Sequence, residues 1–252
     1  MKKIYLVTLL SVIVSCTSTP KKEAALSQDA GFETFKNNFL EAFWKENPSW
    51  ATGVGYHKYD SILEIPSIEN FQHHLQMESA WDDSLKHFDL QQLSENNKTD
   101  YYLLDNYFIS SRWYFDTLKM HNWDPSGYNE GDAFDKIITR TDISLEQRLH
   151  VIDKRLTDIA SYYAAAKSNI SNPAVEQTQF AIDQSNGALD VFKVEIADSL
   201  AHSALSLEDK QRIKQKLIRA DSSITDYVHF LENQLKELEK SGTAHSFRIE
   251  KE

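Results

Sequence analysis

The sequence predicts an all-α protein, a multi-helix bundle of about six helices that follows a signal peptide and a short tether. Seven glycines and five prolines among 252 residues leave long stretches without a helix-breaking residue. Apolar residues recur at spacings of three and four along most of the chain, whereas the alternation typical of strands never extends beyond a few residues. The length beyond the signal peptide is enough to bury one substantial core.

The first 15 residues have the form of a secretory signal peptide. Two lysines precede an apolar run over residues 4–14, which is shorter than the ~20 residues that a membrane-spanning helix needs. Cys16, the single cysteine of the chain, follows two aliphatic residues and Ser15. This segment resembles a bacterial lipobox, which predicts cleavage before Cys16 and lipidation of its thiol. The alternative is a free thiol that is buried as a small apolar residue.

Residues 16–29 are polar and predict a flexible tether between the lipid anchor and a helical domain. The residue after the cysteine is Thr17 and not an aspartate. By its resemblance to bacterial sorting signals, this favours a lipid-anchored protein of the outer membrane that faces the periplasm. The sequence therefore predicts three segments, 1–15, 16–29 and 30–252, and a membrane partner reached through the lipid.

The chain is acidic, with a formal net charge of −11. Removal of the signal peptide with its two lysines makes the remainder more acidic still. An acidic protein is repelled by nucleic-acid phosphates and by anionic lipid head groups. No stripe of basic residues interleaved with aromatic residues is found along the sequence. These observations argue against nucleic acid as a partner.

The first half of the chain predicts three helices. The first covers residues 30–47 and ends there, because Pro48 disfavours the helical conformation of the residue before it. The second covers residues 67–87, and the third begins at the cap residue Ser94. Its aromatic residues between positions 101 and 115 are interpreted as core and second-face packing, with a stacking platform for glycans or peptides as the alternative.

The second half predicts a short helix over residues 132–139 and three longer ones. Ser144 and Gln147 form a capping-box pattern that opens the clearest helix of the chain. Its apolar seam alternates at spacings of four and three, which is typical of a helix in an antiparallel bundle. Further helices are predicted from residue 173 to about residue 202 and from residue 206 to residue 241. The seam of the clearest helix consists of Leu145, Leu149, Ile152, Leu156, Ile159, Tyr163, Ala166 and Ile170.

The stretch over residues 43–60 is the least ordinary part of the chain. A proline and two glycines interrupt the helical pattern and predict a turn, which is followed by His57 and Asp60. An imidazole and a carboxylate at this spacing could orient each other as a general base and its partner. They could equally form a structural hydrogen bond that closes the turn. His57 and Asp60 are therefore the candidate catalytic residues of the chain, with both interpretations open.

The other histidines do not form a recognisable metal or catalytic set. No histidine is followed by glutamate, so the sequence contains no H-E-x-x-H zinc motif. His74 and Glu78, four residues apart on a predicted helix, could share an ion or form a solvated hydrogen-bonded pair. No glycine-rich phosphate loop and no serine with an arranged base are found. The sequence predicts no metal and no cofactor in this chain and leaves open whether it is an enzyme.

One motif carries a family resemblance. The stretch over residues 48–60 contains Pro48, Ala51, Thr52, Gly55, His57 and Asp60. This pattern resembles one found near the start of the bacterial family known as domain of unknown function 885. The segment over residues 155–170 and the aromatic helix that begins at Asp100 also resemble that family, so the similarity covers most of the chain.

The resemblance has two implications. Full-length members of that family look like helical zinc metallopeptidases, with an H-E-x-x-P-G-H type of motif in their second half. That motif is absent from this sequence. The resemblance therefore implies that the chain is an amino-terminal half and that zinc belongs to the missing half.

Three hypotheses of function follow. In the first, the chain is the non-catalytic helical half of a membrane-anchored lipoprotein of the metallopeptidase-like kind, and its partner is a carboxy-terminal half. In the second, it is a stand-alone helical lipoprotein that binds a protein partner or a ligand. In the third, it is a hydrolase that uses His57 and Asp60.

Overall fold

The structure is a computed structural model that describes residues 28–241. The described residues form helices joined by turns and loops, and no strand occurs between residues 28 and 241. This confirms the predicted all-α class. The predicted signal peptide, Cys16 and most of the predicted tether lie outside the described residues, as do residues 242–252.

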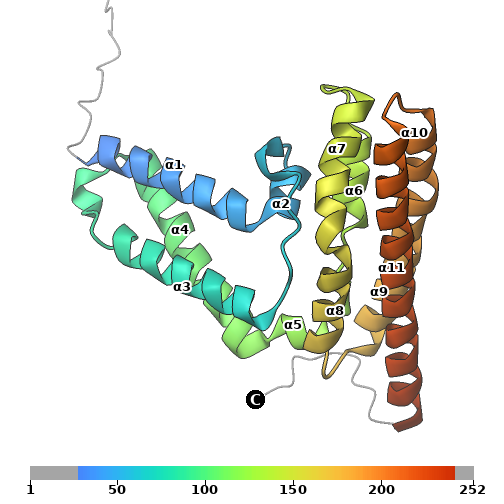
Figure 1. Ribbon diagram of the computed structural model, residues 1–252. Helices are drawn as coiled ribbons and strands as arrows, with labels where there is room; N and C mark the ends of the chain where they lie inside the picture. The colour runs from blue at the N-terminus through green and yellow to red at the C-terminus, as the bar shows by residue number, and fades with distance from the viewer. Residues whose placement is uncertain (1–27, 242–252) are drawn as a thin grey trace, which may run out of the picture.

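The described chain folds into two parts that lie side by side (Figure 1). The first part is made of α1 (Asp29–Glu46), α3 (Ile68–Leu85) and α4 (Glu95–Trp113). The second part, a helical bundle, is made of α6 (Gly131–Ile138), α7 (Leu145–Arg155), α8 (Ile159–Asn169), α9 (Val175–Asp190), α10 (Ala197–His202) and α11 (Leu207–Ser241). The short helices α2 (Pro48–Gly53) and α5 (Met120–Trp123) lie where the chain passes between the two parts (Figure 1).

Aromatic side chains hold the first part together. Four phenylalanines repeat at helical spacing along α1, and all of them are buried. The ring of Phe39 lies 5.2 Å from Phe108 of α4 and 5.7 Å from Trp81 of α3, both in edge-to-face geometry. We call this cluster the aromatic core; it consists of Phe32, Phe35, Phe39, Phe43, Leu85, Leu93 and Phe108.

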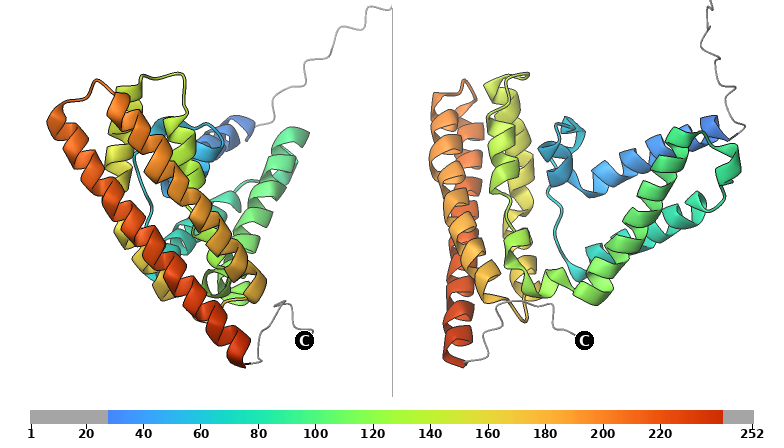
Figure 2. Two further views of the ribbon diagram at one scale, coloured as in Figure 1. Left: turned by 90° about the vertical axis from the view of Figure 1, so that its right-hand side faces the viewer. Right: turned by 180° about the vertical axis from the view of Figure 1, so that it is seen from behind.

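The bundle has a separate core built around α11, which packs mainly against α9 and α8 (Figure 2). Every residue of the predicted seam over residues 145–170 is buried except Leu145, which is half-buried, so the seam prediction is confirmed. We call this cluster the bundle core. Its most deeply buried members, with 0% exposed surface, are Phe134, Ile137, Leu149, Ile152, Ile159, Ala166, Ile196, Ile213, Ala220, Ile224, Tyr227 and Leu231.

Two of the three long helices predicted in the second half are interrupted, whereas the third is the continuous α11. A 3-10 turn over Leu156–Asp158 separates α7 from α8, and a π-helical segment over Val191–Ile196 separates α9 from α10. These two predicted helices are thus present, but each is divided into two pieces. Spacing in the sequence reports which face is apolar, whereas a local change of hydrogen-bond pattern depends on how the helix packs.

The aromatic residues of α4 were predicted to pack in the core or against a second face of the helix, but two of them are largely exposed. Tyr102 is 58% exposed and Trp113 is 48% exposed. Leu40 of α1 is 43% exposed. In the described part of the chain, α1 and α3 pack against one side of α4, so rings on the opposite side have no neighbouring helix to cover them.

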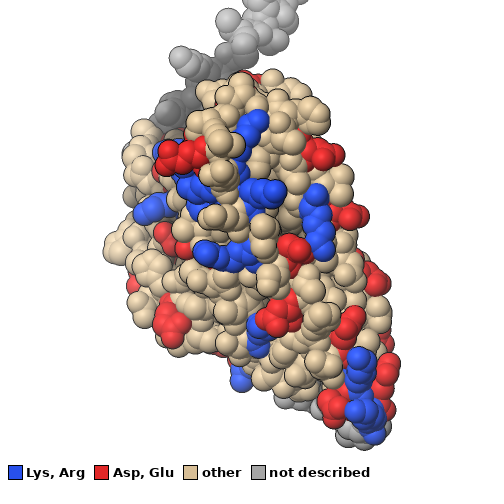
Figure 3. Space-filling view, turned by 45° about the vertical axis from the view of Figure 1, so that its right-hand side comes forward, with Lys and Arg blue, Asp and Glu red and all other residues tan. Residues whose placement is uncertain are grey.

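Charged side chains of both signs are interspersed on the bundle surface that includes α11 (Figure 3). Asp153 of α7 lies 2.9 Å from the Arg212 Nη2 and 2.9 Å from the Lys216 Nζ, both on α11. Burial by itself raises the pKa of Asp153, but the hydrogen bonds from Lys216 and Arg212 outweigh burial and lower it below its ordinary value. These pairs fix α7 against α11.

Candidate functional site

The turn that follows α2 brings the two candidate catalytic residues together. Gly55 has φ of 85°, a left-handed conformation that a residue with a Cβ rarely adopts, and a 3-10 turn over His57–Tyr59 follows. The His57 Nδ1 lies 3.0 Å from the Asp60 Oδ2. Asp60 is 2% exposed, while the His57 side chain is 31% exposed. The predicted contact between imidazole and carboxylate is therefore present.

Asp60 also accepts hydrogen bonds from two other elements. The Thr52 hydroxyl donates to Asp60 Oδ1 at 2.7 Å, and the Arg140 Nη1 donates to Asp60 Oδ2 at 2.9 Å. A buried carboxylate needs such donors to offset the loss of hydration. The carboxylate thus ties the turn to α2 and to the segment after α6. This geometry favours the structural interpretation of the His57–Asp60 pair, and a catalytic role stays an untested prediction.

A fully buried arginine lies beside this turn. Arg155, at the end of α7, has 0% exposed surface. Its Nη2 donates to Glu130 Oε2 at 2.7 Å and to the hydroxyl of Ser49, and its Nη1 donates to the backbone oxygens of Asp60 at 3.1 Å and of Ile62 at 2.6 Å. One guanidinium thereby links α2, the turn after it, the segment before α6, and α7. We call Arg155, Glu130, Ser49 and Asp60 the arginine junction.

The family-like motif over residues 48–60 is therefore a packing unit. Ala51 has 0% and Thr52 has 2% exposed surface, and Pro48 is also buried. Pro48 occupies the first turn of α2, where its fixed backbone angle and missing N–H cost nothing. The residues of this motif place the arginine junction between the two parts of the molecule.

Sequence reasoning missed the arginine junction. Arg155 carried a local signal, because it follows Ile152 by three and precedes Ile159 by four, which places it on the buried face of the helix. A charged residue on such a face needs a buried partner. Glu130 carried no comparable signal, since it lies before α6 outside any apolar pattern.

A second polar cluster surrounds His74 on α3. The His74 Nε2 lies 2.7 Å from Glu64 Oε1 and 3.3 Å from Glu46 Oε2. Burial by itself lowers the pKa of His74, but the hydrogen bond and charge of Glu64, together with the charge of Glu46, outweigh burial and raise it above its ordinary value. Burial raises the pKa of Glu64, and the bond to His74 offsets this in part. The pairing predicted with Glu78 is replaced by these two contacts.

We expect the His74 contacts to stabilise the fold most at acidic to neutral pH. Because the folded state raises the pKa of His74, the stabilisation is complete below the pKa of the unfolded chain and is lost as pH rises through the folded pKa. Urea unfolding from pH 6 upward should show a steeper loss of stability in wild type than in His74→Gln. His87→Gln, which changes an exposed histidine near the end of α3, is the control. Equal pH slopes in wild type and His74→Gln would contradict the assignment.

A cavity of about 220 Å³ opens beside His74, between α3 and α4. Glu78 lines it and is 7% exposed. The Tyr107 hydroxyl donates to Glu78 Oε1 at 2.5 Å, whereas Glu78 Oε2 has no hydrogen-bond partner. Among residues 28–241, no group of three or more histidine, cysteine or acidic side chains has an arrangement that could hold a metal ion. The wall of the cavity therefore contains a buried carboxylate, one oxygen of which has no hydrogen-bond partner in the described structure.

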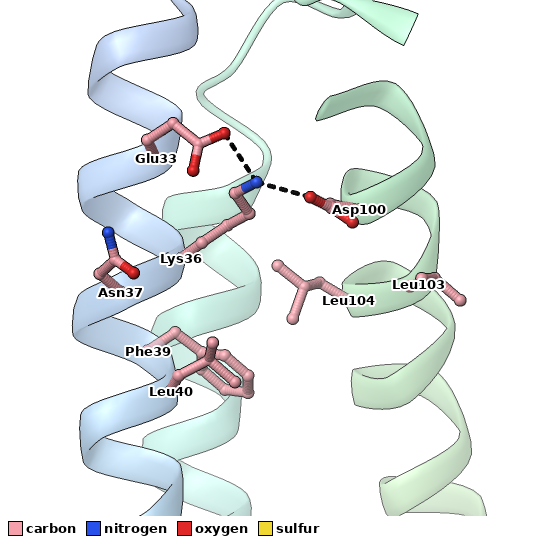
Figure 4. Close-up of a pocket in the computed structure, with 8 residues that line it drawn as sticks. All are labelled: Glu33, Lys36, Asn37, Phe39, Leu40, Asp100, Leu103 and Leu104. Carbon is pink, nitrogen blue, oxygen red and sulfur yellow. Dashed lines mark hydrogen bonds and ion pairs between the residues drawn. The ribbon is translucent and has the colours of Figure 1, made fainter. Parts of the chain in front are cut away.

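A shallow groove of about 290 Å³ lies between α1 and α4 (Figure 4). At one end the Lys36 Nζ lies 2.9 Å from Glu33 Oε1 and 2.5 Å from Asp100 Oδ2. Leu104 projects into the space between the two helices, and Leu40 lies further along the groove (Figure 4). Because the charged groups at its end already pair with one another, the groove offers mainly apolar surface.

An apolar stripe runs along α4 on the side away from α1 and α3. Tyr102, Ile109 and Trp113 are spaced by seven and four residues, so they share one side of the helix. Their exposed fractions are 58%, 63% and 48%. We call these three residues the outer face of α4. The neighbouring Leu103 is 62% exposed and adds to the apolar surface.

The fold and these sites define an all-α protein in two parts that a buried arginine joins. The model of a family described as "Bacterial protein of unknown function (DUF885)" matches residues 48–246. That match covers more than half of the chain, and the protein belongs to this family. The family resemblance of residues 48–60 is thereby confirmed.

One solved structure similar to this chain is described as "a putative lipoprotein of unknown function from Shewanella oneidensis". The two proteins are 36% identical, with a TM-score of 0.84. The similarity covers 87% of this chain and 40% of that chain, so this chain spans less than half the length of that relative. No curated protein matches the chain. Within residues 28–241, no helix is both long enough and apolar enough to cross a membrane.

Proposed function

We propose that this chain is the non-catalytic helical half of a lipid-anchored protein of the cell envelope. It docks through the outer face of α4 on a second, larger half of the metallopeptidase-like kind. The anchor is the lipidated Cys16, and the location is the outer membrane on its periplasmic side. The observation that carries the proposal is the outer face of α4, an apolar stripe without a covering helix in the described residues.

Two side chains of the outer face of α4, Ile109 and Trp113, are one helical turn apart and are neighbours on the helix surface, whereas the polar Asp105 and Asn106 lie between Tyr102 and Ile109. Single exposed hydrophobic side chains are normal, whereas neighbouring large ones indicate an interaction site. Full burial of one large apolar side chain stabilises a complex by ~1.5–3 kcal/mol. Ile109, flanked by Tyr102 and Trp113, is the most exposed of the three and lies between the other two along the helix. It is therefore the expected centre of the contact.

A larger half of the same kind of protein is the partner that best fits this stripe. This chain matches 40% of the similar Shewanella chain, and the description of that protein as a lipoprotein agrees with the lipobox-like segment before Cys16. The zinc motif that the family resemblance implies is absent from this sequence. We therefore assign any peptidase-like chemistry to the partner half and a docking role to this chain.

Photo-crosslinking in the cells that produce the protein tests this proposal. The probe p-benzoylphenylalanine replaces Ile109 in one strain and Ile218 of α11 in a matched control strain. These isoleucines are 63% and 61% exposed, so they differ in location and not in accessibility. We expect the probe at position 109 to join the chain to one polypeptide that carries an H-E-x-x-P-G-H type of motif.

A substitution adds a second readout. Ile109→Asp places a charge in the centre of the contact and should weaken co-purification of that polypeptide by about tenfold or more, which corresponds to ~1.4 kcal/mol. Ile218→Asp should leave co-purification unchanged. A cross-link at position 109 no stronger than at position 218, or a cross-linked protein without the motif, would show that the docking proposal is wrong.

A further inference from the structure

We propose that the cavity between α3 and α4 binds a primary alkylammonium group, such as the end of a lysine side chain or of a small amine, with Glu78 as its counter-ion. This site is independent of the docking proposal. His74 and Tyr107 line the cavity, whereas the proposed docking surface is the outer face of α4, on the other side of that helix.

The burial and incomplete hydrogen bonding of Glu78 are the first indication of a ligand. The side chain is 7% exposed, and it lines the cavity together with Tyr107 and His74. Its Oε1 accepts the Tyr107 hydroxyl at 2.5 Å, and its Oε2 has no hydrogen-bond partner. A buried carboxylate oxygen without a donor is costly, so a donor supplied by a ligand would remove that cost.

The balance of charge favours a cation. Three carboxylates, those of Glu46, Glu64 and Glu78, act on the charge of His74. Even when His74 is protonated, it can neutralise one of the three, and it is already bonded to Glu64 at 2.7 Å. A cation entering the cavity therefore meets the Glu78 carboxylate in the wall, and the Glu46 and Glu64 carboxylates lie beside the wall residue His74. Lys119, whose charge acts on the wall residue His121, is the opposing positive group. Charge interactions are stronger in partly dehydrated surroundings than in water.

Aromatic rings supply the rest of the wall. Phe71 and Phe115 lie 5.8 Å apart, and the His121 ring stacks on Phe115 at 4.6 Å. Ring faces attract cations and also pack well against short alkyl chains. The cavity volume of about 220 Å³ corresponds to about seven water molecules, which suits a short amine and not a drug-sized ligand.

The hydrogen-bond geometry selects an ammonium over other cations. A guanidinium forms its strongest contact with both oxygens of a carboxylate, and at Glu78 it would have to share Oε1 with the Tyr107 hydroxyl. A quaternary ammonium has no N–H with which to satisfy the remaining oxygen. A metal ion requires several ligands, and the described residues offer no set of three arranged for one. A primary ammonium can donate one of its three N–H groups to Oε2 and the others to neighbouring acceptors or water.

Isothermal titration calorimetry with n-pentylammonium chloride tests the site, using the mature chain with Cys16→Ser so that no lipid is attached. We expect saturable binding at one site, and binding of n-pentanol, which has the same chain without the charge, to be at least about tenfold weaker. Glu78→Gln should weaken binding of the amine by a similar factor. Glu95→Gln, which removes an exposed carboxylate at the start of α4, is the control and should bind as wild type does.

Because Glu78→Gln changes a buried side chain and could fail to fold, a second substitution tests the site independently. Tyr114 lines the cavity and is 49% exposed, so Tyr114→Lys adds a positive charge at the rim without disturbing a core. We expect it to weaken amine binding, while Phe180→Lys on α9, at a site that is 56% exposed, leaves binding unchanged. The proposal is overturned by the absence of saturable binding, by equal binding of n-pentanol, by tighter binding of n-butylguanidinium, or by unchanged binding in Tyr114→Lys.

Discussion

Replacing Arg155 with methionine should destabilise the protein by about 3–5 kcal/mol, the range observed when one partner of a buried ion pair is removed. The guanidinium has 0% exposed surface and lies 2.7 Å from Glu130, which is 6% exposed. Without it, the Glu130 carboxylate stays buried without its counter-ion. The backbone oxygens of Asp60 and Ile62 lose their donor as well. Urea unfolding followed by circular dichroism measures the change.

The companion variants separate the ion pair from the loss of side-chain volume. Arg155→Met combined with Glu130→Leu should recover most of the lost stability, because no buried charge remains. The surroundings of Arg155 suit an apolar side chain, since its guanidinium carbon lies 5.5 Å from the centre of the Phe134 ring and its Nε has no hydrogen-bond partner in the described structure. Arg219→Met, at an exposed position of α11, is the control. If the free energy of unfolding falls by less than about 1 kcal/mol in Arg155→Met, the arginine junction does not contribute to stability as we expect.

Replacing Phe39 with alanine should cost about 3–5 kcal/mol, because it removes a whole ring from the aromatic core. Phe39 is 3% exposed and contacts rings of both α3 and α4. The adjacent Leu40 is 43% exposed, so Leu40→Ala is a matched control on the same helix and should change stability by less than about 0.5 kcal/mol.

The effect of Phe39→Ala should also be local. The aromatic core and the bundle core share no residue, so the first part of the molecule can open while the bundle stays folded. Hydrogen exchange followed by mass spectrometry should show faster exchange in α1, α3 and α4, and unchanged exchange in α8, α9 and α11. Equally faster exchange in all six helices would mean that the two cores unfold as one unit.

The structure separates two surfaces with different chemistry on the same helix. The outer face of α4 carries large apolar side chains, whereas the opposite side contributes Tyr107 to the cavity that contains Glu78. A protein half that docks on the apolar stripe would not need to enter the cavity. Loss of docking in Ile109→Asp with intact amine binding would show that the two proposed sites act independently.

Part of the candidate site could be predicted from the sequence. His57 and Asp60 are three residues apart in a segment that a proline and two glycines shape into a turn, so their contact follows from local geometry. Arg140, the third member of this contact, is 80 residues from Asp60 in the sequence. A contact over such a distance depends on how α2 and α6 pack, and no local pattern indicates it.

The sequence by itself determined that this protein is helical, where α1, α3, α6 and α11 begin and end, and which residues of α7 and α8 enter the bundle core. Helical periodicity, caps and proline positions act within a few residues and can be recognised without knowledge of the fold. The tertiary structure alone decided that Arg155 pairs with Glu130, that His74 pairs with Glu64 and Glu46, and that one side of α4 is left exposed. The physical reason is that burial and pairing depend on which segments, distant in sequence, come into contact when the helices pack.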